Sequence, residues 1–508
     1  MFKKISLRLW VTLLLIAVQV ALVASLVSLA ILRFPAITYV GFGVSFVVFL
    51  YILRTDGESA YKITWIIVVL SLPLIGGILY WLCGKDHLIR RRIVAHVEEH
   101  ALIAKLLDKD EVLLLENQVE CERMYSLMRY VRQYSSYHPY ENTPAKYYPF
   151  GELMFEDMLT ALERAEKFIF LEFFIIEESG MWNNILEVLE RKAAQGVEVR
   201  LIVDDFGSQR LFTSKYIKAL RAKNILVLRF NPIVPLLLVF MNHRDHRKIL
   251  VVDGKSAFVG GVNIADEYIN KNDRLGVWKD TGLKLTGDGV WSFTLMFIEM
   301  WDTFCKACER IDDHSMYRQV FAEDFNADGF VLPYGDSPLD EQRLAENIYI
   351  DILAQARNYV YIFTPYLIIS EKMIHALQMA ARRGVDVRII MPGIPDKKLI
   401  FRLSRSYYTC LLEAGVRIFE YTPGFLHAKT FVCDDETAVV GTINLDYRSL
   451  YLHFECATLL YGSDIVKSIK EDAIDTIAQC REVDIQSLKK PSSTGMLDAV
   501  LHLFSPLL

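Results

Sequence analysis

The chain has 508 residues, of which 53% are hydrophobic, and its mean hydropathy is positive. This size and composition exceed what one soluble domain needs and indicate a membrane part together with a large globular part. The formal net charge of -6 excludes a generally basic protein that coats nucleic acid, although positive charge can still be concentrated locally. The eight cysteines include one Cys-x-x-Cys, Cys305 to Cys308, and no second pair, so we expect reduced core residues and no metal.

Three apolar runs lie within the first 85 residues. Residues 9–32 carry no charge over 24 residues, which at 1.5 Å per residue can cross a hydrocarbon core of about 30 Å. This run is too long for the core of a signal peptide. The other two are residues 34–53 and 63–83. We therefore expect a transmembrane region over residues 1–85 with two or three helices, and buried core helices are the alternative interpretation.

Positive charges near these runs give conflicting indications of topology. Arg90-Arg91-Arg92, after the last run, favours a cytoplasmic location for the rest of the chain, whereas Lys3, Lys4 and Arg8 favour a cytoplasmic amino terminus. Three complete spans cannot satisfy both. Either the first two runs form a shallow hairpin or one cluster is overruled, and we expect a multi-pass membrane protein whose globular part is cytoplasmic.

Beyond Gly84 a charged helical connector over residues 86–140 precedes a pattern of apolar strands and amphipathic helices that occurs twice. In each copy a strand leads into a helical stretch that ends near a glycine, and a second strand starts at once. The second strands begin at Gly196 and Gly384. This pattern predicts an α/β fold of two lobes, residues 141–330 and 331–508, each with a βαβ unit of parallel strands.

Each copy ends in the pattern His-x-Lys-x-x-x-x-Asp, followed by a glycine and an asparagine 14 and 17 residues after the histidine. Two copies with the same downstream spacing are far rarer by chance than one. The residues are His246, Lys248, Asp253, Gly260 and Asn263 in the first copy, and His427, Lys429, Asp434, Gly441 and Asn444 in the second.

Strand geometry indicates what these residues can do. Side chains alternate along a strand, so the histidine and lysine of each motif point to the same face. We interpret Asp253 and Asp434, at strand-to-turn positions, as holding the local backbone. If the lobes face one another, two histidines, two lysines and the amides of Asn263 and Asn444 form one pocket.

Such a pocket fits a phosphodiester. The lysines can neutralise the non-bridging oxygens, and the amides can donate to them. One neutral histidine can attack phosphorus. The other, protonated, can give its proton to the leaving alcohol and later deprotonate the incoming one. The nucleophile needs an acceptor at its other ring nitrogen, and Asp280 and Glu455, one carboxylate per lobe, are the candidates; a surface or structural role for either acid is the alternative.

Paired motifs of this kind resemble the phospholipase D superfamily, and the remainder is similar to its bacterial cardiolipin synthases of the Gram-positive type. The branch resemblance includes His243-Arg-Asp-His246-Arg-Lys248, Thr364-Pro-Tyr366 and the terminal Phe504-Ser-Pro-Leu-Leu508. It implies two pseudo-symmetric lobes with mixed sheets flanked by helices, and an enzyme of the bacterial cell membrane. It further implies transfer of a phosphatidyl group between two phosphatidylglycerol molecules, giving cardiolipin and glycerol through a phosphatidyl-histidine, without metal or other cofactor.

The resemblance assigns His246 as nucleophile and His427 as acid/base, and the reverse assignment is open. A phospholipase D that hydrolyses lipid would use the same residues with water as acceptor. A nuclease would need a basic groove, and a scaffold would be expected to have lost a histidine or lysine. Two segments have two interpretations each: residues 234–241 and the amphipathic tail 496–504 either contact lipid or pack in the core. Glu172 and Tyr366 are candidates to line the pocket.

Overall fold

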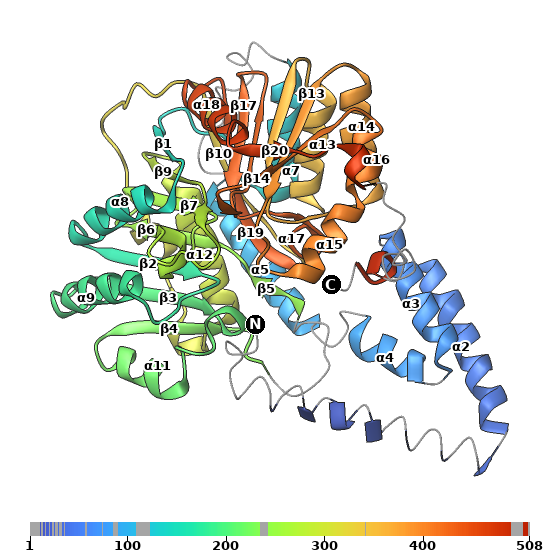
Figure 1. Ribbon diagram of the computed structural model, residues 1–508. Helices are drawn as coiled ribbons and strands as arrows, with labels where there is room; N and C mark the ends of the chain where they lie inside the picture. Colours follow the sequence, from blue (N-terminus) through green and yellow to red (C-terminus); the bar gives the residue numbers. More distant parts are fainter. Residues whose placement is uncertain are drawn as a thin grey trace. The chain divides into compact units, whose positions relative to one another are not determined.

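The computed structural model describes a few positions between residues 11 and 34, and then residues 36–55, 58–73, 75–84, 90–107, 122–233, 242–340, 342–488 and 501–505 (Figure 1). The chain divides into two compact units, which are described separately below. The first comprises Met1–Val94, Asn231–His243 and Ser493–Leu508, and the second comprises Ala95–Phe230 and Arg244–Ser492.

The first unit is helical, with α2 over Ala36–Arg54, α3 over Ser59–Ser71 and α4 over Ile75–Cys83. The third apolar run, residues 63–83, does not form one helix, because the chain breaks between α3 and α4. Pro73 lies in this break, and its carbonyl accepts from the N–H of Ile75. Among the described residues, no helix combines the length and the apolar character that a membrane span requires. Most of the run over residues 9–32 lies outside the described residues.

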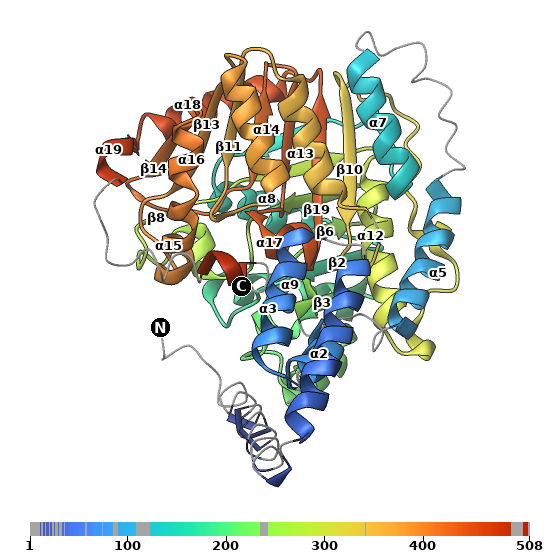
Figure 2. The same ribbon diagram turned by 90° about the vertical axis from the view of Figure 1, so that its right-hand side faces the viewer.

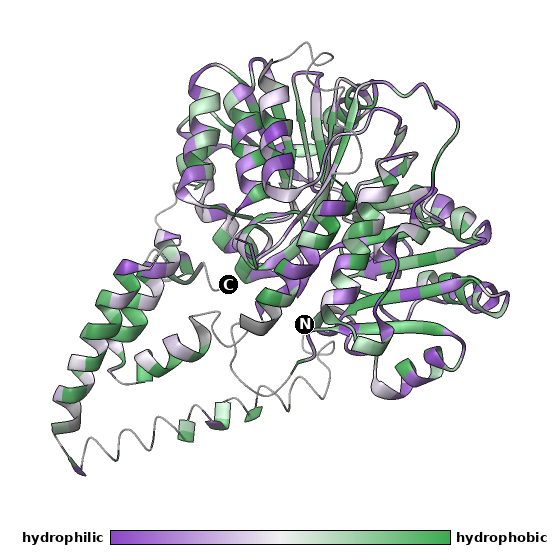
Figure 3. Cartoon of the chain, turned by 180° about the vertical axis from the view of Figure 1, so that it is seen from behind, coloured by the Kyte–Doolittle hydropathy of each residue, from purple (hydrophilic) through white to green (hydrophobic). Residues whose placement is uncertain are grey.

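These helices pack on a small shared core and otherwise expose apolar side chains. Trp65 and Tyr80, both buried, meet edge to face with ring centroids 5.5 Å apart. In contrast, Tyr39 is 79% exposed and Phe46 is 56% exposed. Figure 3 shows hydrophobic colouring along the length of α2 and α3. An apolar surface of this extent is typical of a lipid or protein contact.

The carboxyl-terminal tail is described only at residues 501–505, where it is helical in part. The Leu503 carbonyl accepts from the hydroxyl of Thr64 in α3 at 2.6 Å, and Leu501 is buried. The described part of the tail therefore packs within the first unit. Residues 234–241 lie outside the described residues.

The second unit contains two α/β lobes with mixed sheets, as the repeat predicts. The sheet of the first lobe has the order β1-β9-β7-β6-β2-β3-β4. Its parallel strands β2 and β3 are joined through α9, and this is the expected βαβ unit. Its elements are β1 (Ala145–Tyr148), α8 (Gly151–Glu163), β2 (Phe168–Phe173), α9 (Gly180–Ala194), β3 (Glu198–Asp204), α10 (Asp205–Ser208), α11 (Ser214–Arg221), β4 (Ile225–Phe230), β5 (Arg244–Asp245), β6 (Lys248–Val252), β7 (Ser256–Gly260), β8 (Val277–Lys279), β9 (Gly282–Thr286) and α12 (Val290–Phe304).

The sheet of the second lobe has the order β10-β19-β17-β16-β11-β13-β14-β20, and β11 and β13 are parallel. Helices α13 and α14 lie side by side over it (Figure 2). Its elements are β10 (Phe330–Asp336), α13 (Leu344–Gln355), β11 (Tyr359–Phe363), β12 (Leu367–Ile368), α14 (Glu371–Arg382), β13 (Asp386–Pro392), α15 (Lys398–Ser406), α16 (Tyr408–Leu412), β14 (Arg417–Tyr421), β15 (Gly424–Leu426), β16 (Thr430–Cys433), β17 (Thr437–Gly441), β18 (Leu445–Asp446), α17 (Tyr447–Tyr451), β19 (His453–Tyr461), α18 (Ile465–Ile477), β20 (Cys480–Glu482) and α19 (Ile485–Leu488).

Helices outside the repeats support both lobes. Helix α12 is buried along almost its whole length and contacts β2 and β6 of the first lobe and β10 of the second. Helices α5 (Arg90–Leu107) and α7 (Glu122–Ser135) occur within the predicted connector. His100 of α5 is 2.9 Å from Glu299 of α12, which ties the connector to this central helix.

The aspartates of the two motifs stand at the far end of the strand from the motif lysines, in a turn with positive φ. Asp253 has φ 54° and Asp434 has φ 52°, values that aspartate tolerates better than most residues. Each carboxylate accepts hydrogen bonds from three consecutive backbone N–H groups at the start of the neighbouring strand. The donors are residues 166, 167 and 168 for Asp253, and residues 357, 358 and 359 for Asp434.

We expect Asp253→Ala to lower the free energy of unfolding by about 2–4 kcal/mol. Three backbone N–H groups lose their charged acceptor, and alanine tolerates the positive φ at this position less well than aspartate does. Denaturant titration would measure the change, with the exposed Asp312→Ala as control. An unchanged unfolding midpoint in Asp253→Ala would contradict the anchoring role.

Candidate active site

Each motif histidine is positioned by pairing between a strand of its own lobe and a strand of the other lobe. Strand β5, just before His246, pairs in parallel with His453 and Phe454 at the start of β19, and the N–H of His246 donates to the Phe454 carbonyl at 2.9 Å. On the other side, β15 pairs in parallel with β8, and the N–H of His427 donates to the Lys279 carbonyl at 2.7 Å. Each histidine therefore rests on a strand of the opposite lobe.

The carboxylates that contact the two histidines also come from the opposite lobes. Nδ1 of His246 lies 2.9 and 3.0 Å from the two oxygens of Glu455, which belongs to the second lobe. Nδ1 of His427 lies 2.7 Å from Asp280 Oδ2, which belongs to the first lobe. Both acids are fully buried. The structure thus brings both predicted carboxylates to the predicted histidines, and each acid serves the histidine of the other lobe.

The two carboxylates are accommodated differently. Glu455 accepts from the Thr442 hydroxyl at 2.5 Å. Thr442 corresponds to Gly261 in the first lobe, where a Cβ atom would collide with Asp280 Oδ1. The shorter aspartate therefore requires a glycine, whereas the longer glutamate is fixed by a hydroxyl. Sequence reasoning missed both residues, although each directly follows the glycine of the motif.

The motif lysines are buried beside the histidines. Nζ of Lys248 donates to the His246 carbonyl at 2.5 Å, and Nζ of Lys429 donates to the His427 carbonyl and lies 2.9 Å from His427 Nδ1. Burial lowers the pKa of Lys248 to about 8, and Glu455 opposes this shift. Burial lowers the pKa of Lys429 to about 7 against the opposing effect of Asp280.

This environment favours the neutral form of both histidines. Burial lowers the pKa of His246 well below its usual value, and the positive charges of Lys248 and Lys429 lower it further. Burial and Lys429 lower the pKa of His427 to about 4, although the Asp280 carboxylate acts in the opposite direction. Two neutral imidazoles among buried cations form a site that favours an anion.

The predicted phosphate-binding asparagines have different partners. Oδ1 of Asn263 accepts from the Ile175 N–H at 3.0 Å, and its Nδ2 donates to the Tyr268 hydroxyl at 2.9 Å. Nδ2 of Asn444 donates to Asp446 at 3.3 Å, and its buried Oδ1 has no hydrogen-bond partner among the described residues. Each Nδ2 donates one of these hydrogen bonds, and phosphate binding by the two asparagines stays a prediction.

Glu172 and Tyr366 were candidates to line the pocket. Glu172 is fully buried and lies 4.0 Å from the Arg247 guanidinium, and burial together with Asp245 raises the pKa of Glu172 well above its usual range. Tyr366 donates its hydroxyl to Asp396 at 2.7 Å. Arg247 is thus an ion-pair partner of Glu172, but neither carboxylate oxygen of Glu172 has a hydrogen bond among the described residues. For Glu172 and Tyr366 alike, a role in lining the pocket stays a prediction.

Aromatic rings flank each histidine. The rings of Phe174 and His453 have centroids 5.0 and 5.4 Å from that of His246. Around His427, the centroid of Trp278 lies at 5.4 Å and that of Tyr268 at 5.6 Å. These rings exclude water from the imidazoles, and the motif spacing gave no signal for them.

Two clusters could geometrically hold a metal ion among the described residues. One is His246, His453 and Glu455, and the other is Glu99, Asp302 and His314. The first cluster lies close to Lys248 and Lys429, whose charges lower the pKa of His246 and would equally oppose a divalent cation. The expectation that no metal is required stays a prediction.

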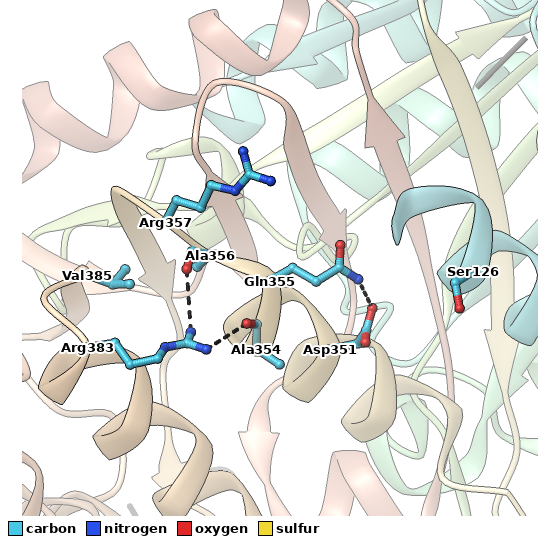
Figure 4. A pocket seen from close by; sticks show the side chains of 8 residues that line it. All are labelled: Ser126, Asp351, Ala354, Gln355, Ala356, Arg357, Arg383 and Val385. Atoms are coloured by element: carbon cyan, nitrogen blue, oxygen red, sulfur yellow. Dashed lines mark hydrogen bonds between the residues drawn. The ribbon is translucent and has the colours of Figure 1, made fainter. Parts of the chain in front are cut away.

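A surface hollow lies away from these residues. It is lined by side chains from α7, from α13 and the two residues after it, and from the segment between α14 and β13 (Figure 4). In it, Arg383 donates to the carbonyls of Leu353, Ala354 and Ala356, at the end of α13. These bonds satisfy carbonyls that a helix end leaves without partners, which is a structural role.

Comparison with known proteins identifies the family. The family described as cardiolipin synthase, PLD-like domain, matches residues 158–284 and again residues 349–475. A cardiolipin synthase of Geobacillus kaustophilus is 32% identical over 453 residues, which cover 89% of this chain and 89% of that protein. The chain belongs to the cardiolipin synthase family. In this family member, residues 43–85 also match the phospholipase D-nuclease N-terminal family.

Further relatives cover the chain to a similar extent. Cardiolipin synthase 2 of Bacillus anthracis is 32% identical over 90% of this family member and 88% of its own length. An uncharacterized protein of Streptococcus mutans is 46% identical over 90% of this chain and 99% of its own. The crystal structure of phosphatidylserine synthase from Haemophilus influenzae covers 72% of this chain and 93% of its own, with a TM-score of 0.56 and 14% identity, which indicates a shared fold.

The buried lysines of this cardiolipin synthase family member predict a stability that depends on pH. The pKa of Lys429 is about 7 in the folded chain and about 10.4 in the unfolded chain, so between these values the unfolded chain binds more protons. The contribution of Lys429 to the free energy of unfolding therefore rises as pH rises from about 7 to about 10.

We expect Lys429→Met to raise the free energy of unfolding at pH 7 by about 1–3 kcal/mol, and the gain to shrink toward pH 10. Thermal unfolding at the two pH values would measure it, and the exposed Lys398→Met serves as control. A variant less stable than the parent at pH 7 would contradict the destabilising effect of this buried cation.

Proposed function

We propose that this protein is a cardiolipin synthase that transfers a phosphatidyl group from one phosphatidylglycerol to a second, giving cardiolipin and glycerol. One observation carries the proposal: each of two buried neutral histidines is held by a carboxylate of the other lobe, beside two buried lysines. This arrangement supplies a nucleophile and an acid/base at one phosphodiester. The names of the relatives support lipid as the substrate.

In the first step His246 attacks phosphorus through Nε2, because its Nδ1 is engaged by Glu455. The P–N bond forms as the P–O bond to glycerol breaks, and protonated His427 gives its proton to the glycerol oxygen. His427 obtains that proton on substrate binding, since the negative phosphate and Asp280 both favour the imidazolium. The product is a phosphatidyl-histidine and free glycerol.

In the second step the headgroup hydroxyl of another phosphatidylglycerol attacks phosphorus. His427 takes the hydroxyl proton, the new P–O bond forms, and the P–N bond to His246 breaks. Lys248 and Lys429 neutralise the equatorial oxygens in both steps, and the remaining N–H groups of Asn263 and Asn444 donate to them. The low exposure of both histidines supports transfer to an alcohol rather than to bulk water.

Lipid access is supported by the first unit. The exposed side chains of α2, such as Tyr39, Phe46 and Val47, form an apolar surface that a bilayer would cover. We propose that this unit associates with the bacterial cell membrane and that the two lobes act at its cytoplasmic side, on substrate and product lipids that stay in the membrane. Nucleic acid is not a proposed partner.

The test is incubation of the purified protein in detergent with phosphatidylglycerol and a chelator, followed by separation of the lipids and assay of glycerol. The parent is expected to form cardiolipin and glycerol in equal amounts. His246→Ala and His427→Ala are expected to lower the rate by at least about 10³-fold. Phosphatidic acid in place of cardiolipin would indicate a hydrolase, and turnover that needs added metal would contradict the two-histidine mechanism.

The division of labour between the histidines has its own test. Because His427 serves the second step as base, His427→Ala is expected to retain a phosphatidyl group on His246 when the donor has a good leaving group, which needs no acid. A p-nitrophenyl phosphodiester of a diacylglycerol is a suitable donor, and mass spectrometry of the proteolysed protein locates the adduct. An adduct on His427 in His246→Ala, with none in His427→Ala, would establish the reverse assignment.

A further inference from the structure

A third histidine lies in the candidate active site and has no part in the two-histidine chemistry. His453 starts β19, two residues before Glu455 on the same strand. Its ring centroid is 5.4 Å from that of His246, with an angle of 42° between the ring planes, and the side chain is 9% exposed. His453 is therefore a buried neighbour of the proposed nucleophile.

Both ring nitrogens of His453 are buried and have no hydrogen-bond partner among the described residues. The Glu455 carboxylate lies 3.7 Å from Nδ1, which is beyond hydrogen-bond distance. Burial lowers the pKa of His453 to about 3, so the ring is neutral and offers one donor and one acceptor. Buried polar atoms without partners are costly, so these two nitrogens are candidates to bind a polar group of the substrate.

The equivalent position in the first lobe is occupied by Trp278, which allows a comparison with His453. Trp278 stands two residues before Asp280, as His453 stands two residues before Glu455. Its ring centroid is likewise 5.4 Å from the neighbouring histidine, His427. Trp278 belongs to the hydrophobic core of the first lobe, and an indole has no acceptor nitrogen. Packing against a catalytic imidazole therefore does not require a polar ring, and the two sides of the site differ in hydrogen-bonding capacity.

We propose that His453 binds a hydroxyl of the glycerol headgroup beside His246 and thereby selects glycerol-type alcohols as acceptors. This inference rests on the proposed function, in which a glycerol hydroxyl meets the phosphorus on His246 in each direction of the reaction. A ring nitrogen of a neutral imidazole can donate to or accept from a hydroxyl, and glycerol carries further hydroxyls besides the one that reacts. His453 forms no covalent bond: in the transfer step the P–N bond to His246 breaks, the P–O bond to the alcohol forms, and the proton passes to His427.

The test is competition between two alcohols for the phosphatidyl-enzyme. The full-length protein in detergent receives phosphatidylglycerol with equal concentrations of ¹³C-labelled glycerol and 1-propanol, which lacks the second and third hydroxyls. Mass spectrometry gives the ratio of labelled phosphatidylglycerol to phosphatidylpropanol. This ratio does not depend on how much of a variant is folded, so a merely structural loss leaves it unchanged. The variants are His453→Ala, His453→Asn and, as control, His375→Ala on the exposed face of α14.

We expect the parent and His375→Ala to prefer glycerol, and His453→Ala to lower this preference by roughly tenfold, because a site built to bind a hydroxyl loses its partner. His453→Asn keeps a donor and an acceptor and is expected to stay within about threefold of the parent. A parental preference retained in His453→Ala would overturn the role of His453. A parent that transfers lipid to neither alcohol and makes no cardiolipin would instead overturn the proposed function.

Discussion

The exchange of partners between the lobes is the constraint on which the site depends. A strand from each lobe pairs with the strand that precedes the other lobe's histidine, and the carboxylate that follows then reaches that histidine. The backbone hydrogen bonds fix the position of each imidazole, and the carboxylate fixes its ring and its tautomer. Because two short parallel pairings set both histidines, the register between the lobes determines the distance between the two reacting groups.

The electrostatics of the site follow from this packing. Lys248 and Lys429 are almost completely buried, and two carboxylates offset only part of the cost. The balance is restored when an anion enters, so the free energy that burial costs the empty protein favours the binding of a phosphodiester. A neutral imidazole suits the proposed nucleophile, because a protonated ring nitrogen has no lone pair with which to attack phosphorus.

Sequence reasoning identified the residues of the site, but not which carboxylate contacts which histidine. The strand and helix pattern that occurs twice was sufficient to predict a two-lobed α/β fold, because strand and helix periodicity can be read from neighbouring residues. The paired spacing of His246, Lys248 and His427, Lys429 predicted the groups of the site. The assignment of each acid to the opposite histidine depends on strand pairing between lobes, which no local pattern contains. For the same reason, sequence reasoning gave His453 no role. Hydropathy alone could not predict the break at Pro73 between α3 and α4.

The crossed carboxylates also make the two histidines depend on the same pairing of the lobes. Both imidazoles take their acceptor from the lobe across from them, so any separation of the lobes that widened the entrance would release both histidines together. An opened site would then hold neither an oriented nucleophile nor an oriented proton donor. In the proposed mechanism, chemistry is therefore confined to the arrangement in which the lobes are paired, and the lipid is enclosed before it reacts.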